Sequence, residues 1–161
     1  GLEIAMDFHD EPFGKSAELR SYAVRTQAQK GTTRIYRIAS AYMIWRQVRL
    51  TLAVTYVLPE HDTLSVVKTL LNRLDKLDFR MTVLYLDKGF CCGEIIQYLQ
   101  QQKQATILAC PIRGKEGGTK AFCKSRGSYR TTYTFTDGTT VDIVMAATLP
   151  NGGGANTPVN G

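Results

Sequence analysis

The sequence has no hydrophobic run that approaches the roughly 18 apolar residues of a membrane-spanning helix. Its first residues, Gly1 to Ile4, lack the basic and apolar regions of a secretory signal peptide. We therefore expect a soluble, cytoplasmic protein.

Cysteine and histidine are also scarce, and this weakens the case for a zinc site. The chain has two histidines, and its cysteines show no C-x-x-C spacing. The four cysteines are Cys91, Cys92, Cys110 and Cys123. We expect them to be reduced thiols, most of them small residues of the core.

The overall composition is that of an ordinary globular domain. The chain has 161 residues, of which 43% are hydrophobic and 21% charged, so it is long enough for one core. Residues 150–161 contain mostly glycine, asparagine and proline and have almost nothing to bury. We therefore expect one domain over residues 1–149, followed by a disordered tail or linker over 150–161.

Positive charge is concentrated in one stretch of the sequence. The chain has 20 basic against 14 acidic residues, a net charge of +6, and residues 113–130 account for +5 of it, with six basic residues and only Glu116 as an acid. The basic residues are Arg113, Lys115, Lys120, Lys124, Arg126 and Arg130. With interleaved glycines and aromatic residues, this stretch suits contact with a DNA backbone, and a solvated basic loop is an equally good interpretation.

Residue patterns in the first half of the chain predict three strands and a helix. Polar and apolar residues alternate over residues 2–8 and 48–57, and residues 34–45 are rich in strand formers. The last two segments are expected to pair antiparallel, with a turn near Arg46 and Gln47. Asp62 is expected to cap an amphipathic helix, which would lie on the sheet.

Residue patterns near the C-terminal end of the chain predict a short strand followed by a hairpin. The stretch "ATILACP", residues 105–111, is typical of a short strand stopped by proline. Two strand-like runs then flank Asp137 and Gly138, a strong hairpin signal, so a hairpin is expected at about residues 128–147.

Between these halves, "TVLYLDKGFCCGEIIQYL", residues 82–99, has the pattern of a buried strand, a turn and a helix. Asp87 would stand at the carboxyl end of the strand, where open α/β sheets bind their ligands. Asp7 is near the end of the first expected strand. An aspartate beside glycine can also simply cap a helix or make a turn, and this alternative is open for Asp87.

Four segments together resemble the DDE-type transposases of bacterial and archaeal insertion sequences, over residues 2 to about 145. They are "IAMDFHDEPFGK" (4–15), "RLTLAVTYV" (49–57), "VLYLDKGFCCGEIIQYLQ" (83–100) and "ILACPIRGK" (107–115). The resemblance implies an α/β fold, a ribonuclease H-like mixed sheet flanked by helices, with the start of a β-rich insertion at the C-terminal end.

The resemblance also implies that the first and fourth strands are neighbours, so that Asp7 and Asp87 are catalytic and bind metal ions together. Hard divalent cations such as Mg²⁺ or Mn²⁺ prefer oxygen ligands, and two ions roughly 3.5–4 Å apart can activate an attacking oxygen and stabilise the leaving one. Lys88 would steady a DNA phosphate near the metals, or would be a solvated turn residue. His9, Asp10 and Glu11 are expected to be loop residues, not ligands.

The family also has a third carboxylate, a glutamate on a later helix, for which we find no counterpart. Glu116 falls in the basic stretch, Asp137 at a hairpin tip and Asp142 in an expected strand. The chain therefore resembles a catalytic-core fragment that stops inside the insertion, and the fragment is expected to be inactive without the missing glutamate.

The function that the resemblance implies is metal-dependent cleavage and strand transfer of DNA during transposition. The partners would be DNA, as transposon ends and target, and further copies of the full-length protein in a homo-oligomer. One alternative is a non-catalytic nucleic-acid-binding remnant of a transposase. Another is a metal-dependent nuclease unrelated to transposition.

Overall fold

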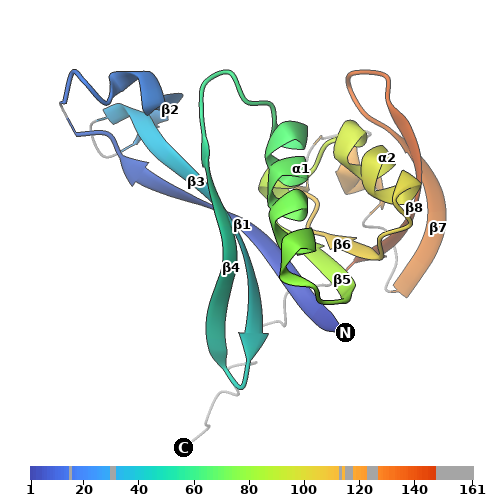
Figure 1. Ribbon diagram of the computed structural model, residues 1–161. Coiled ribbons are helices and arrows are strands. Elements are labelled where there is room, and N and C mark those ends of the chain that lie inside the picture. The colour runs from blue at the N-terminus through green and yellow to red at the C-terminus, as the bar shows by residue number, and fades with distance from the viewer. Residues whose placement is uncertain (15, 30–31, 113, 115–117, 123–126, 148–161) are drawn as a thin grey trace, which may run out of the picture.

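A computed structural model describes residues 1–14, 16–29, 32–112, 114, 118–122 and 127–147. The chain forms a mixed α/β structure with a six-stranded sheet, two α-helices and a separate β-hairpin (Figure 1). In the part of the chain thus described, no helix has both the length and the apolar character to cross a membrane.

The first half of the sheet is antiparallel. Strand β1 (Leu2–Pro12) pairs with the long strand β3 (Thr32–Trp45). The other edge of β3 is shared by β2 (Val24–Gln29) and β4 (Val48–Val57). The expected turn between β3 and β4 is present, and Arg46 and Gln47 have positive φ values of 47° and 67°, as a tight two-residue hairpin requires.

The second half of the sheet is parallel and is built through the two α-helices. Helix α1 (Thr63–Leu74) leads to β5 (Met81–Leu86), which pairs parallel with β1. Helix α2 (Gly93–Gln101) leads to β6 (Thr106–Leu108), which pairs parallel with β5. Four short 3-10 helices complete the described elements: η1 (Arg20–Tyr22), η2 (Asp75–Leu77), η3 (Lys88–Phe90) and η4 (Thr119–Phe122).

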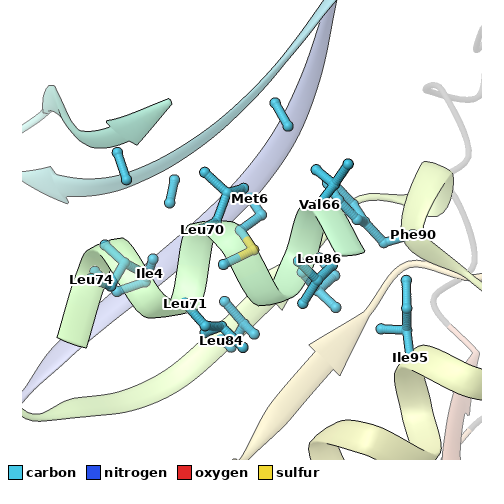
Figure 2. Packing of buried hydrophobic residues seen from close by; sticks show 14 of the residues in the cluster. Ile4, Met6, Val66, Leu70, Leu71, Leu74, Leu84, Leu86, Phe90 and Ile95 are labelled. Carbon is cyan, nitrogen blue, oxygen red and sulfur yellow. The ribbon is translucent and has the colours of Figure 1, made fainter. Parts of the chain in front are cut away.

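Helix α1 starts where the sequence predicts it, because the carboxylate of Asp62 accepts a hydrogen bond from the N–H of Ser65 at 2.6 Å. Its apolar side packs on alternate residues of the central strands, Ile4 and Met6 of β1 with Leu84 and Leu86 of β5 (Figure 2). Residues Ile95 and Leu99 of α2 join the same cluster. Both helices therefore cover the same face of the sheet.

The opposite face of the sheet has a different character. Asp7 and Ser40 are direct cross-strand partners on this face, since Met6 and Ala41 on either side of them are buried under the helices. Val54 and Tyr56 of β4 are 48% and 62% exposed. No described helix packs on this face.

The C-terminal hairpin forms where Asp137 and Gly138 predict it, from β7 (Gly127–Thr134) and β8 (Thr140–Ala147). It lies beside α2 (Figure 1), whose Gln100 side-chain amide donates to the carbonyl of Asp142 at 2.7 Å. A Cβ on Gly93 would clash with the side chain of Thr139, so glycine permits the close approach of α2 and the hairpin turn.

Two expectations about the N-terminal segment were wrong. Strand β1 continues to Pro12 instead of ending near Phe8, because β3 is long enough to pair with it throughout, and Pro12 at the strand end needs no N–H partner. Strand β2 was not predicted, so the strand before Asp87 is the fifth and not the fourth. The predicted tail, residues 150–161, lies outside the described residues.

Candidate metal and nucleic-acid site

Asp7 and Asp87 are brought together by the parallel pairing of β1 with β5. Met6 is the register partner of Leu86, and the N–H of Asp87 donates to the carbonyl of Met6 at 3.4 Å. The adjacent aspartates therefore lie side by side where β5 ends, although β1 continues past Asp7 to Pro12, so that the expected strand-end position of Asp7 was wrong. Both side chains are half-buried.

The side chain of Asp87 does not cap the following helical turn. Asp87 is the N-cap residue of η3, but its side chain makes no capping hydrogen bond. The turn is closed instead by backbone groups, since the N–H of Phe90 donates to the carbonyl of Asp87 at 3.0 Å. A side-chain cap is thus excluded, whereas the alternative of a turn residue holds for the backbone of Asp87.

The carboxylate oxygens of Asp7 and Asp87 are suitable ligands for one hard divalent cation. Carboxylates only accept, and within the described ranges neither Asp7 nor Asp87 has an ion pair or a side-chain hydrogen bond. No group of three or more histidine, cysteine, aspartate or glutamate side chains with metal-binding geometry occurs among the residues described. Asp7 and Asp87 would therefore supply two of the ligands of such a cation.

The three residues that follow in β1 have other partners. The guanidinium of Arg37 donates to both oxygens of Asp10, at 2.7 and 2.8 Å, and this hydrogen-bonded pair raises the pKa of Arg37. The ring Nε2 of His9 lies 2.6 Å from the carboxylate of Glu11. These residues belong to a strand and not to a loop, so that expectation was wrong, and in the described part of the chain they form no group of three or more metal ligands.

The candidates for a third carboxylate are also engaged locally. The carboxylate of Asp137 accepts from the N–H of Thr139 at 2.8 Å, and this hydrogen bond lowers its pKa. The carboxylate of Asp142 accepts from the hydroxyl of Thr132 at 2.7 Å across the hairpin. Glu116 lies outside the described residues. Asp137 and Asp142 thus have structural roles in the hairpin.

The basic stretch is described only in part. Lys120 in η4 and Arg130 in β7 are both exposed. The other four predicted DNA contacts, Arg113, Lys115, Lys124 and Arg126, lie outside the described residues. The role of the stretch in DNA binding therefore stays a prediction.

A groove of about 700 Å³ opens beside Asp87. Its lining includes Asp87, Lys88 and Gly89, which follow β5, together with residues of the loop between β4 and α1. Sequence reasoning missed the remaining charged residues of this groove, which are Arg25, Arg34, Arg37 and Asp10. The only signal in the sequence was the expected strand over residues 34–45, which contains Arg34 and Arg37 but does not show that β2 and β3 lie next to Asp87.

Two thiols also meet near this edge of the sheet. The Sγ atoms of Cys91 and Cys110 are 3.4 Å apart and are not joined by a disulfide. The hydrogen bond from Cys91 lowers the pKa of the Cys110 thiol to about 7. Cys91, Cys92 and Cys110 are half-buried thiols, whereas Cys123 lies outside the described residues.

No protein-family model matches the sequence, and no curated protein matches it either. The structure is similar to that of a piggyBac transposase solved in a synaptic complex with hairpin DNA. The TM-score is 0.53 at 11% sequence identity, over 89% of this chain and 33% of the transposase chain. This chain therefore spans about a third of the length of that protein, and the likeness shows that the two share a fold over this part.

Proposed function

We propose that this chain is part of the catalytic core of a DDE-type transposase, of the kind found in insertion sequences, and that it acts on DNA in transposition. The proposal includes a ribonuclease H-like fold, a cytoplasmic location and a homo-oligomer of the full-length protein. It also treats the β7 and β8 hairpin as the start of a β-rich insertion.

The observation that carries the proposal is the register of β1 and β5. It sets Asp7 and Asp87 side by side at the edge of a sheet whose fold is similar to part of a transposase. Two adjacent carboxylates without a cationic partner in the described structure repel each other, and a bound cation removes this repulsion. The placement thus favours a ligand over a purely structural pair.

The proposed cofactor is Mg²⁺ or Mn²⁺, held by the carboxylates of Asp7 and Asp87. When bound, such an ion supplies charge stabilisation for the displacement at a DNA phosphate and lowers the pKa of an attacking water or 3′-hydroxyl. The protein side chains position the reacting groups. Lys88, exposed in the turn after Asp87, is placed to pair with a phosphate beside the carboxylates.

A second candidate function is a non-catalytic DNA-binding remnant of a transposase. It is favoured by the absence of a cluster of three or more metal ligands in the described part of the chain. This remnant would bind DNA through its basic residues, but its affinity for metal would not depend on Asp7 and Asp87.

Thermal unfolding in Mn²⁺ tests the catalytic proposal without requiring activity. A ligand that binds only the folded state adds about 2.7 kcal/mol to the free energy of unfolding at 100 times its Kd. We expect millimolar Mn²⁺ to raise the Tm of the unmutated chain, and Asp7→Asn or Asp87→Asn to remove most of this rise.

Asp75→Asn is the matched control, because Asp75 is exposed and lies at the far end of α1. It should keep the full shift. If the shift is absent from the unmutated chain, or the same in the Asp7 and Asp87 variants, the metal site is wrong.

A further inference from the structure

The groove beside Asp87 has walls from four parts of the chain. Residues of β2 and β3 form one wall, and the loop from Val57 to Thr63 forms a second. Phe8 and Asp10 of β1 line it as well, and so do Asp87, Lys88 and Gly89, whereas Asp7 does not. A molecule bound in this groove would therefore contact Asp87.

Positive charge predominates in the groove. Its lining has four cationic side chains and two carboxylates, and Arg37 neutralises Asp10 through two short hydrogen bonds. Arg25, Arg34 and Lys88 thus face a single remaining carboxylate, that of Asp87. Such a surface attracts an anion.

Arg25 and Arg34 are direct cross-strand partners of the antiparallel pair formed by β2 and β3. Like charges in this position destabilise a sheet. Arg34 is half-buried, and its guanidinium donates to the carbonyl of Ala23 at 3.4 Å, which restrains it near Arg25. A phosphate bound by both side chains would turn this repulsion into two charge-assisted contacts.

The groove also offers an apolar surface. The ring of Phe8 is stacked on that of Phe90, with centroids 4.1 Å apart, and the guanidinium of Arg37 lies 5.4 Å from the Phe8 centroid. Phe8 is thereby fixed on both sides. Val57 and Leu58 add aliphatic surface. Because its ring is covered in this way, Phe8 contributes apolar lining to the groove and no free face on which a base could stack.

We propose that this groove binds a single strand of DNA, with Arg25 and Arg34 on one phosphate and Lys88 on another next to Asp87. The cations belong to separate elements, β2 with β3 and η3, so they suit successive phosphates of a chain better than one free phosphate ion. The inference rests on the proposed function and extends it, since it assigns the path of the substrate strand to residues outside the basic stretch 113–130.

The test measures binding of a short fluorescent single-stranded oligodeoxynucleotide by anisotropy, in EDTA and over a series of salt concentrations. For single strands, each phosphate that the protein neutralises adds about 0.7 to the steepness of log K against log salt. Arg25→Gln with Arg34→Gln removes the contact to one phosphate, so it should flatten the slope by about 0.7 and weaken binding roughly tenfold or more at low salt. Inorganic phosphate at the same ionic strength should compete only weakly.

The control is Lys76→Gln with Arg80→Gln, which removes the same charge from exposed residues just before β5, at the opposite end of that strand from Asp87. It should keep the slope of the unmutated chain. Thermal melts check folding, and the Arg25 and Arg34 variant should melt no lower than the unmutated chain because a like-charge pair is removed.

The outcomes separate this inference from the proposed function. If the unmutated chain binds DNA and both double variants bind equally, the groove is wrong while DNA binding stands. If inorganic phosphate displaces the oligonucleotide at stoichiometric amounts, the groove is a phosphate site and the inference is again wrong. If the unmutated chain binds no DNA at all, both the groove and the proposed function fail.

Discussion

The N–H of Asp87 donates a hydrogen bond to the carbonyl of Met6, and this contact sets Asp87, which directly follows β5, beside Asp7 in the middle of β1. The bond belongs to the ladder between β1 and β5. The position of Asp87 is therefore maintained by the sheet and not by the turn that follows it. A carboxylate substitution at either aspartate should leave this backbone contact intact, so binding and folding can be measured separately.

The first prediction concerns DNA cleavage. The described residues supply two adjacent carboxylates and no third ligand beside them. The 161-residue chain should therefore bind DNA but nick supercoiled plasmid very slowly in Mn²⁺. A longer form that includes a glutamate-bearing helix should nick roughly 10³-fold faster, the usual effect of one strong electrostatic group. Gel assays of both forms provide the measurement, and rapid nicking by the short chain that Asp87→Asn abolishes would reveal a third ligand.

The second prediction concerns the two arginines that face each other on β2 and β3. Arg25→Glu should replace repulsion of Arg34 by attraction and raise the free energy of unfolding by about 0.2–1 kcal/mol. The gain should shrink at high salt, because screening weakens exposed charge pairs. Denaturant melts at two salt concentrations measure it, with Arg80→Glu as the control that should show no gain.

The third prediction concerns the close packing of Gly89 against Phe8. A Cβ at residue 89 would lie 2.8 Å from Cδ2 of Phe8, whose ring is stacked on Phe90 and cannot easily withdraw. Gly89→Ala should therefore destabilise the protein by roughly 1–3 kcal/mol. Gly14→Ala is the control, since a Cβ there meets nothing within 4 Å. Equal melting temperatures for both variants would contradict this packing.

The fourth prediction concerns the reactivity of Cys110. Its pKa is lowered to about 7 by the hydrogen bond from Cys91, so alkylation by iodoacetamide should reach half its maximal rate near pH 7. Because the folded-state pKa is depressed, the stabilisation linked to this thiolate grows as the pH rises above about 7 and is lost as the pH falls through that value.

Peptide mapping by mass spectrometry distinguishes Cys110 from the other cysteines. Cys91→Ala should move the midpoint upward, toward the value of an ordinary thiol, whereas Cys92→Ala should leave it in place. A midpoint that is insensitive to Cys91→Ala would show that another group lowers the pKa.

The sequence alone determined the local features of the fold, because each depends on residues close together in the chain. Turn chemistry located the bend at Asp137 with Gly138, and the break between two strand-like segments located the bend at Arg46 with Gln47. The side-chain oxygen of Asp62 set the start of α1, and apolar spacing determined which side of that helix is buried. The sequence also singled out Asp7 and Asp87, through their positions at expected strand ends.

Only the tertiary structure decided which distant residues meet. The length of β1 follows from its pairing with β3, which overrides the local signal of Pro12. The groove combines residues from β2, β3 and the turn after β5, and the Cys91 and Cys110 thiols come from different loops. Cross-strand register and sheet order create these neighbours, and no local pattern of residues encodes them, because pairing energy is decided by the whole sheet.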